Sequence, residues 1–253
     1  MISVNNLTCG YYDDVNVLTD ISFTVPSNKK MLIVGPNGCG KTTLLRAMAG
    51  LIPYQGNVLI DGEDVSAFSK KELSKKVALL SQLSNIYFSY SVYETVMQGR
   101  YVHLKSTFFK GETQIDKEVV ALCLETTGLL EMKDKNIKEL SGGQLQRVFL
   151  ARVLAQEPEI ILLDEPTNHL DLRYQLELMN YLDKWVQESG HIVIGVVHDM
   201  NLALSFADEI MMLKDGKIFA CDHRDTLDLD LIDKTFDTNV TAYMRESLKK
   251  WER

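Results

Sequence analysis

The sequence has few features of a secreted or membrane-spanning protein. Its four cysteines, Cys9, Cys39, Cys123 and Cys221, are far apart and show no CxxC or Cys/His metal-ligand spacing. Such cysteine usage indicates reduced thiols in a cytosolic protein. The N-terminus has no basic region followed by an apolar run, so we expect no signal peptide. No stretch approaches the ~18 uncharged apolar residues of a membrane-spanning helix. If the chain serves a membrane, we expect it to lie on one face.

Positive charge is also scarce. The 253 residues include 27 Lys and Arg against 35 Asp and Glu, which gives a formal net charge of −8. Non-specific nucleic-acid binding depends on basic patches, and no Lys/Arg run suggests one, so we expect no nucleic-acid partner. The sequence has no internal repeats or low-complexity tracts. Its hydrophobic content of 45% is enough for a sizeable core.

Apolar segments of strand length alternate with segments of helical periodicity. Expected strands are 2–9, 21–25, 31–34, 57–64, 77–80, 160–163 and 192–197, and expected helices are 42–49, 92–99, 115–126, 144–155, 174–188 and 201–207. This alternation predicts a mainly parallel α/β sheet with helices on both faces, and a helical insertion near 86–156. Asp215-Gly216, between two further apolar segments, predicts a type I′ hairpin.

Residues 35–42 fit the pattern G-x-x-x-x-G-K-[ST], directly after an expected strand and before an expected helix. The residues are Gly35, Pro36, Asn37, Gly38, Cys39, Gly40, Lys41 and Thr42. Glycines let successive backbone N–H groups face phosphates, and the helix N-terminus adds partial positive charge. Lys41 can reach the β- and γ-phosphates, the Thr42 hydroxyl can ligate Mg²⁺, and Thr43 can hold the α-phosphate. Chance alone produces the pattern in roughly one chain in a hundred of this length.

Two acids, Asp164 and Glu165, follow an apolar run of strand length. Seen alone they would fit an ordinary polar turn, but the carboxyl ends of parallel strands form the sites of α/β sheets. We therefore expect Asp164 to hold Mg²⁺ and Glu165 to deprotonate the attacking water. Gln82 and His198 follow other expected strands. A lone glutamine there would normally be a loop residue, and a lone histidine would usually be structural or merely exposed. We expect His198 to contact the γ-phosphate.

Ser141-Gly142-Gly143-Gln144, preceded by Leu140, reads locally as a helix start with Ser141 as N-cap. The motif, with Leu145-Gln146-Arg147 after it, resembles the signature of ATP-binding-cassette (ABC) ATPases, and the resemblance covers essentially the whole chain. It implies that Tyr11, or else Tyr12, stacks on adenine and that Gln82 is the Q-loop residue, which is catalytic and a Mg²⁺ ligand. It also implies that Asp164 and Glu165 are the Walker B pair, that His169-Leu170-Asp171 is the D-loop and that His198 is the switch histidine.

The resemblance implies the ABC nucleotide-binding fold, with ATP and Mg²⁺ as ligands. This fold has a P-loop core and an N-terminal antiparallel β subdomain, here residues 1–85 and 157–253, and a helical signature subdomain at about 86–156. It also implies a head-to-tail homodimer in which Ser141 and Gly143 touch the γ-phosphate held by Lys41 of the other subunit. ATP would close the pair and hydrolysis would open it.

Residues 96–104 and 166–171, the latter leading into Tyr174-Gln175, are similar to importer ATPases for iron-siderophores, haem and vitamin B12, and related oxyanion importers share this pattern. The similarity implies a peripheral protein on the cytoplasmic face of the membrane, two polytopic membrane subunits that dock near the Q-loop, and an extracytoplasmic substrate-binding protein that acts indirectly. We expect the docking surface to use an aromatic and methionine stripe, some or most of which could instead be core. The stripe comprises Ile86, Tyr87, Phe88, Tyr90, Tyr93, Met97 and Tyr101.

Three rival interpretations remain to be weighed, and the sequence tests two of them. The third, a soluble ABC ATPase for iron–sulfur assembly or scaffolding, would share every motif; a neighbouring gene for a polytopic membrane protein, or co-purification with the membrane fraction, would distinguish the importer from it. A translation-factor ABC protein carries two cassettes, whereas this chain has one P-loop and one signature. An exporter half-transporter carries fused membrane spans, which this sequence does not contain. The importer ATPase is therefore the leading interpretation.

Overall fold

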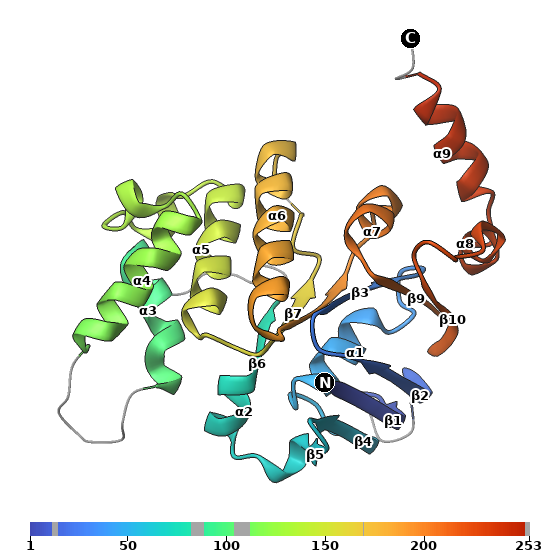
Figure 1. Ribbon diagram of the computed structural model, residues 1–253, viewed down its shortest axis with the longest axis horizontal. Helices are drawn as coiled ribbons and strands as arrows, with labels where there is room; N and C mark the ends of the chain where they lie inside the picture. Colours follow the sequence, from blue (N-terminus) through green and yellow to red (C-terminus); the bar gives the residue numbers. More distant parts are fainter. Residues whose placement is uncertain (12–14, 82–88, 104–111, 169, 251–253) are drawn as a thin grey trace. The chain divides into compact units, whose positions relative to one another are not determined.

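The computed structural model describes residues 1–11, 15–81, 89–103, 112–168 and 170–250 (Figure 1). Predictions for Tyr12, Gln82 and His169 therefore lie outside the described residues, as do those for residues 86–88. The chain forms two compact units, one of residues 1–66 and 194–253, and one of residues 67–193. Among the described residues, no helix combines the length and the apolar character that crossing a bilayer requires.

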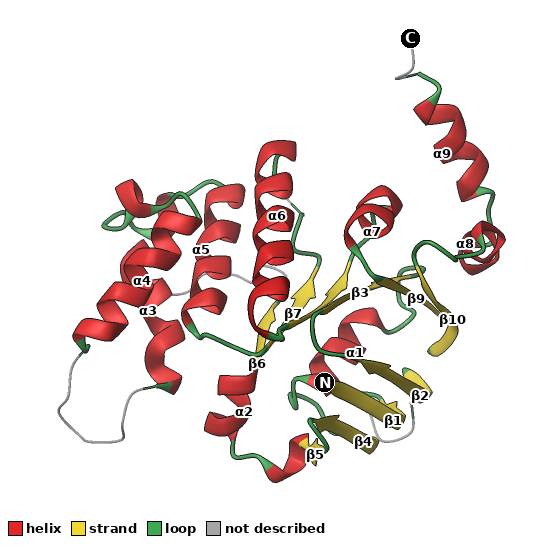
Figure 2. Ribbon diagram, in the orientation of Figure 1, coloured by secondary structure: helices red, strands yellow, loops and turns green. Residues whose placement is uncertain are grey.

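The first unit contains an antiparallel sheet with strand order β2-β1-β4-β5 (Figure 2). Its strands are β1 (Ile2–Cys9), β2 (Leu18–Val25), β4 (Gln55–Ile60) and β5 (Glu63–Asp64). Ile2 of β1 pairs with Val25 of β2 on one side and with Ile60 of β4 on the other. These three side chains are buried, so the sheet has one apolar face. The antiparallel subdomain predicted for the N-terminal region is confirmed.

The same unit holds part of a second sheet, in the order β10-β9-β3. Strand β3 (Lys29–Val34) runs parallel to β9 (Glu209–Lys214), which forms a hairpin with β10 (Lys217–His223). Asp215 and Gly216 in the turn both have positive φ, 48° and 73°, as a type I′ turn requires. The unit's helices are α1 (Lys41–Met48), α7 (Met200–Phe206), α8 (Leu229–Phe236) and α9 (Val240–Leu248).

In the second unit, β6 (Val77–Leu80) and β7 (Ile160–Asp164) pair in parallel, with Val77 opposite Ile160. Every residue of β7 is buried. Strand β8 (Ile192–Val196) starts in this unit and ends in the first one. The α-helices are α2 (Lys70–Lys76), α3 (Val92–Met97), α4 (Gln114–Thr126), α5 (Gly142–Ala155) and α6 (Leu172–Ser189). Helices α3, α4 and α5 contact one another, which confirms the helical insertion (Figure 1).

Short 3₁₀ turns connect several of these elements. They are η1 (Val65–Ala67), η2 (Gln98–Val102), η3 (Leu130–Met132) and η4 (Ile137–Glu139). Turn η2 continues directly from α3, so residues 92–102 form one helical segment with a tighter final turn. The α/β fold with a mainly parallel sheet, predicted from the alternation of strands and helices, is confirmed.

In the described part of the second unit, four helices begin with a capping box, in which the N-cap side chain and the third residue of the helix exchange hydrogen bonds with each other's backbone N–H. The pairs are Ser69 with Glu72, Ser91 with Glu94, Thr113 with Asp116, and Ser141 with Gln144. An N-cap of this kind is worth about 1 kcal/mol. Helix α2 was not predicted, because it buries no residue and so shows no apolar periodicity.

Candidate nucleotide-binding and catalytic site

The P-loop connects β3 to α1, as predicted. Gly35 has φ of 154°, and a Cβ there would lie 2.0 Å from the carbonyl oxygen of Leu213 on β9. Gly40 has φ of 104°, and its Cβ would lie 2.5 Å from the Leu18 side chain. Positive φ and the missing space both require glycine at these two positions. The loop is thus packed against two neighbouring strands while Asn37 and Gly38 at its tip are exposed.

Lys41 starts α1 and is 7% exposed. Its Nζ donates to the carbonyl oxygens of Gly35 and Pro36, at 2.8 and 2.9 Å, so the side chain follows the inside of the loop. Cys39 is buried beside it, and burial raises the pKa of the Cys39 thiol above its usual value, although the Lys41 ammonium lowers it. The loop therefore keeps a cation at its centre and a neutral thiol next to it.

Helix α1 begins without a side-chain cap from its N-cap residue. That residue is Gly40, which has no side chain to donate or accept a hydrogen bond. The N–H groups of a first helical turn have no partner within the helix, and the helix dipole adds partial positive charge. Together with Lys41, this end of α1 has the features of a phosphate-binding site.

Tyr11 lies beside the same helix. Its hydroxyl accepts hydrogen bonds from Thr43 Oγ1 at 3.4 Å and from Arg46 Nη1 at 3.3 Å. The side chain is 49% exposed. The hydroxyl is thus held by α1 while about half of the side chain stays open, which is compatible with the predicted stacking on adenine.

His198 follows β8 in the first unit. The preceding residue, Val197, donates its N–H to the carbonyl of Ile33 on β3 at 3.3 Å. Ile33 is two residues before Gly35, so the chain positions exposed His198 at the end of β3 that leads into the P-loop. Asp199 caps α7 by accepting from Asn201 N at 2.8 Å, which fixes the backbone immediately after His198.

The second unit carries the predicted acid pair. Asp164 ends β7 and is 5% exposed. Glu165 has φ of 54°, a left-handed conformation that costs of order 1–3 kcal/mol in a residue with a side chain. Its carboxylate accepts from Asn168 Nδ2, and its carbonyl accepts from Asn168 N at 3.2 Å. The strained backbone and these two bonds turn Glu165 away from the line of the strand.

The predicted Mg²⁺ ligands have suitable chemistry. Mg²⁺ binds oxygen donors, commonly one or two protein oxygens completed by phosphates and water. The Thr42 hydroxyl in the first turn of α1 and the buried carboxylate of Asp164 are such donors. Thr42 belongs to the first unit and Asp164 to the second.

The signature motif and Asp171 share a hollow in the second unit. Ser141 caps α5 by accepting from Gln144 N at 3.3 Å, and Asp171 caps α6 by accepting from Tyr174 N at 3.1 Å. The hollow has a volume of about 490 Å³. Its lining residues are Ser141, Gly142, Gly143, Gln144, Arg147, Asp171 and Tyr174. The structure thus brings together signature and D-loop residues that the sequence places some 30 residues apart.

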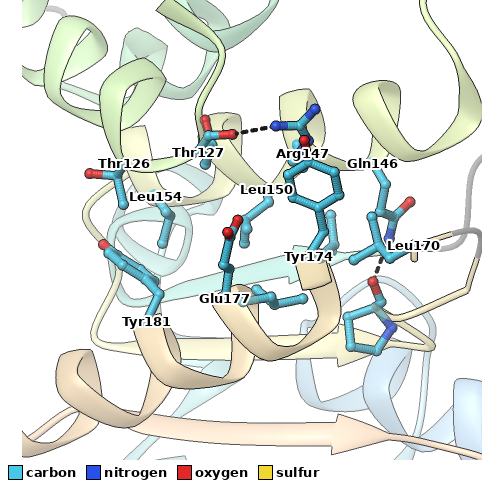
Figure 3. Close-up of a pocket in the computed structure, with 13 residues that line it drawn as sticks. Thr126, Thr127, Gln146, Arg147, Leu150, Leu154, Leu170, Tyr174, Glu177 and Tyr181 are labelled. Atoms are coloured by element: carbon cyan, nitrogen blue, oxygen red, sulfur yellow. Dashed lines mark hydrogen bonds between the residues drawn. The ribbon is translucent and has the colours of Figure 1, made fainter. Parts of the chain in front are cut away.

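Arg147 connects this hollow to a more apolar cavity (Figure 3). Its guanidinium lies 3.9 Å from the centroid of the Tyr174 ring and donates to the carbonyl of Thr127 at 3.1 Å. Gln146, on the same helix, donates to the carbonyl of Pro166 at 3.2 Å. The two side chains join α5 to α6 and to the segment directly after Glu165.

The expected docking stripe is divided. Tyr90 and Tyr101 are 39% and 61% exposed, whereas Met97 is 4% exposed and belongs to the core. Tyr93 is half-buried, and its hydroxyl donates to Glu112 at 3.1 Å. Burial, followed by this contact with Glu112, raises the pKa of Tyr93 to about 12. Of the described members of the stripe, therefore, only Tyr90 and Tyr101 are largely exposed to solvent.

Comparison with known proteins assigns the family. Residues 18–168 match the family described as ABC transporter. The chain is 38% identical to the ferric enterobactin transport ATP-binding protein of Escherichia coli, over 85% of this chain and 78% of that protein. It is also similar in structure to a dimeric bacterial ABC transporter cassette, with a TM-score of 0.78 and 29% identity over 88% of this chain and 99% of that one.

The chain belongs to the family of ABC transporter ATPases. It spans 55% of the length of another relative, an uncharacterized ABC transporter ATP-binding protein of Bacillus subtilis, at 37% identity over 95% of this chain. The family and fold expected from the signature motif are thereby confirmed.

Within this ABC ATPase, sequence reasoning missed several residues that hold the motifs. Asn168 contacts the carboxylate of Glu165, and Gln175 Nε2 donates to the carbonyl of Leu170 at 3.1 Å beside Asp171. Gln146 and Arg147, which follow the signature residues, are two more, through their hydrogen bonds to Pro166 and Thr127. Both side chains are buried although they are polar, and their spacing in the sequence gives no signal of that burial.

Proposed function

We propose that this chain is the Mg-dependent ATP-binding and ATP-hydrolysing subunit of an ABC importer for iron-siderophore, haem, cobalamin or a related metal or oxyanion cargo. The observation that carries the proposal is the N-terminus of α1, which has a glycine as its N-cap and where a glycine-rich loop encloses the Lys41 ammonium. A polyphosphate is the ligand that such an anion site fits best.

Each site residue then has a defined task. Lys41 and the first-turn N–H groups of α1 bind the phosphates, Thr42 contributes a hydroxyl, and Tyr11 supports the adenine. Mg²⁺ held by Thr42, Asp164 and Gln82 would neutralise charge on the phosphates. Glu165 accepts the proton of the attacking water, and Asn168 holds that carboxylate in place. His198 donates to the γ-phosphate.

The chain works in this proposal as a head-to-tail homodimer. Ser141 and Gly143 lie at the N-terminus of α5, which belongs to the second compact unit of the same chain. This helix start is a second anion-binding helix end. The hollow in front of it, which also contains Asp171, has room for a phosphate brought by a partner subunit. The dimeric cassette to which the chain is similar supports this arrangement.

Two polytopic membrane subunits would dock near Gln82 on the cytoplasmic face of the membrane, with an extracytoplasmic binding protein delivering the cargo. Support comes from the ferric enterobactin relative and from the exposed tyrosines Tyr90 and Tyr101 on the segment that follows the Q-loop. Aromatic side chains are enriched at such contacts.

The decisive experiment measures transport and location together. In its native host the gene is deleted, and uptake of a ⁵⁵Fe-labelled siderophore is measured after complementation with the wild-type chain or with Glu165→Gln. We expect only the wild type to restore uptake, and both proteins to sediment with membranes. A chain that restores no uptake phenotype and floats free of membranes after gentle lysis would instead be a soluble ABC ATPase.

Cargo is tested in the same strains. Uptake of labelled cobalamin, haem and molybdate is compared with that of the ferric siderophore, because the membrane and binding subunits determine selectivity. Loss of one cargo class on deletion assigns the transporter, and intact uptake of all of them contradicts the importer proposal.

A further inference from the structure

The segment after α3 has no part in the chemistry proposed above, yet it contacts the end of the signature helix. Gly99 and Arg100 lie in η2, and His103 follows it. All three meet the C-terminal end of α5, the helix that begins at the signature motif. Gly99 and Arg100 are buried, so this is an internal contact.

Side chains of the preceding segment donate hydrogen bonds to the C-terminal end of α5. The last carbonyls of a helix have no partner within it. Here the carbonyl of Ala155 accepts from Arg100 Nη1 at 2.8 Å, and that of Gln156 accepts from His103 Nε2 at 2.9 Å. At Arg152 the carbonyl lies so close to η2 that a Cβ on Gly99 would come within 2.2 Å of it.

Arg100 is a buried cation, 3% exposed. Its Nε donates to Asp116 Oδ1 at 3.0 Å, and its Nη1 also contacts Glu157. Asp116 is itself buried and caps α4 together with Thr113. A cation at a helix C-terminus is favoured by the helix dipole. The guanidinium therefore joins α4, α5 and η2 in one charge-paired contact.

Gln156 extends the contact to the sheet. Its Nε2 donates to the carbonyls of Ser74 and Val77, the latter at 3.0 Å. Val77 is the first residue of β6, the strand after which Gln82 follows. The end of α5 is thus attached to the strand before the Q-loop through Gln156, and to the helical segment after it through Arg100 and His103.

A small rotation of α5 about its C-terminal end produces a large displacement of its N-terminus. Helix α5 has 14 residues and so is about 21 Å long at 1.5 Å per residue. Over that length, a rotation of about 3° about the C-terminal end moves the N-terminus by about 1 Å. A displacement of that size at a reacting site can reduce a rate by on the order of a hundredfold.

We infer that Gly99, Arg100 and His103 form a clasp on the C-terminal end of α5, and that they are positioning residues for Ser141 and Gly143 at its start. The inference rests on the proposed head-to-tail pairing. The clasp determines the position at which Ser141 and Gly143 meet the phosphate held by the partner subunit. Because the end of α5 also contacts the strand before the Q-loop and the helical segment after it, that position depends on both of these segments.

The test uses the double variant Arg100→Met/Asp116→Leu, because replacing both partners avoids leaving one buried charge unpaired. Arg100→Lys is the second variant, since it keeps the charge but loses the planar fork that reaches three acceptors. Turnover and ATP binding by the isolated chain are measured well below the unfolding temperature of each. We expect kcat to fall at least tenfold in the double variant and less in Arg100→Lys, with ATP binding by the isolated chain unchanged.

A mixing experiment separates positioning from a structural effect. Each clasp variant is mixed with Lys41→Ala, and one composite site of a head-to-tail pair is then free of both lesions. We expect turnover above that of either variant alone. The control is Lys214→Met/Asp237→Asn, which removes another ion pair that also contacts a helix end, through the carbonyl of Lys234. It should lower the unfolding temperature without lowering kcat.

Failure of the clasp and failure of the head-to-tail pairing give different results. Unchanged kcat in both clasp variants, or loss of ATP binding by the isolated chain, overturns the clasp. The reference mixture is Ser141→Arg with Lys41→Ala. If that mixture regains turnover and the clasp mixture does not, the clasp alone is wrong. If the reference mixture does not regain turnover, the proposed pairing fails, and the inference fails with it.

Discussion

Asn168 donates its side-chain N–H to the carboxylate of Glu165, three residues earlier, in the turn that follows the buried strand β7. A second bond, from the Asn168 backbone N–H to the Glu165 carbonyl, closes the same turn. Together they hold Glu165 in its left-handed conformation. The expected general base is therefore fixed by its own loop rather than by the strand.

Glu165→Gln is expected to reduce ATP turnover by on the order of 10²–10⁴-fold, because the amide keeps the shape of the side chain but cannot accept a proton. ATP binding should stay close to wild type, and the ATP-bound pair should accumulate in size-exclusion chromatography. Asn168→Ala should have a smaller effect on kcat in the same direction. Near wild-type turnover in Glu165→Gln would show that another group is the base.

Ser141→Arg and Lys41→Ala are expected to separate the two helix ends. Lys41→Ala removes the cation within the P-loop, so ATP binding by the isolated chain should weaken. Ser141→Arg adds a bulky cation at the start of α5, so binding by the isolated chain should change little while ATP-driven dimerisation and turnover collapse. Equilibrium binding of a fluorescent ATP analogue measures nucleotide binding by the isolated chain, and light scattering measures ATP-driven dimerisation. Equal loss of binding in both variants would mean that the signature acts on its own nucleotide.

Asp116 predicts a pH dependence of stability. Burial alone would raise the pKa of its carboxyl, but hydrogen bonds from Thr113 and Arg100 outweigh it and hold the pKa below its usual value. A carboxyl whose pKa is depressed by folding stabilises the protein above its unfolded-state pKa, about 3.9 for Asp, and this contribution is lost as the pH falls through the folded pKa.

Asp116→Asn should therefore lower the free energy of unfolding by about 3–5 kcal/mol near pH 7, where it leaves Arg100 without its buried partner. The difference from wild type should be constant from about pH 6 to 8 and shrink below about pH 4. Urea denaturation at each pH measures it. Asp237→Asn, at an exposed ion pair, is the control and should cost less than about 1 kcal/mol. A difference that does not depend on pH would contradict the assignment.

Tyr101 and Met97 test the docking surface as a matched pair. Tyr101→Glu should leave the unfolding temperature and basal ATP turnover unchanged, because its side chain is 61% exposed. It should nevertheless abolish co-purification with membrane subunits in mild detergent. Met97→Glu should instead unfold the protein, because it buries a charge among α3, α4 and α5. Normal co-purification of Tyr101→Glu would move the docking surface elsewhere.

The sequence predicts those parts of the site whose signal is local. The P-loop, the acid pair and the signature each occupy consecutive residues, and each follows a strand or begins a helix through ordinary capping and turn chemistry. The Asp215-Gly216 hairpin is predictable for the same reason. Their roles, including that of Gln82, stay predictions.

Contacts between distant segments could not be predicted in this way. Arg100 pairs with Asp116, 16 residues later, and Gln156 donates to the carbonyl of Ser74, 82 residues earlier. Such pairs depend on how helices pack, and charge alone would place Arg100 on the surface. Helix α2 escaped prediction because all its side chains face solvent in part, although Ser69 and Glu72 carry a capping signal.

The hairpin between β9 and β10 is a poor place for an inserted peptide tag, although a two-residue turn would normally tolerate one. The carbonyl of Gly216 accepts from Thr19 N at 2.9 Å, and a Cβ at Gly216 would lie 2.3 Å from the carbonyl oxygen of Val17. Extra residues there would separate β2 from the turn, and Leu18, on β2, is the side chain packed against Gly40. An epitope or fluorophore inserted at this turn would therefore label a protein in which the P-loop had lost its packing against Leu18.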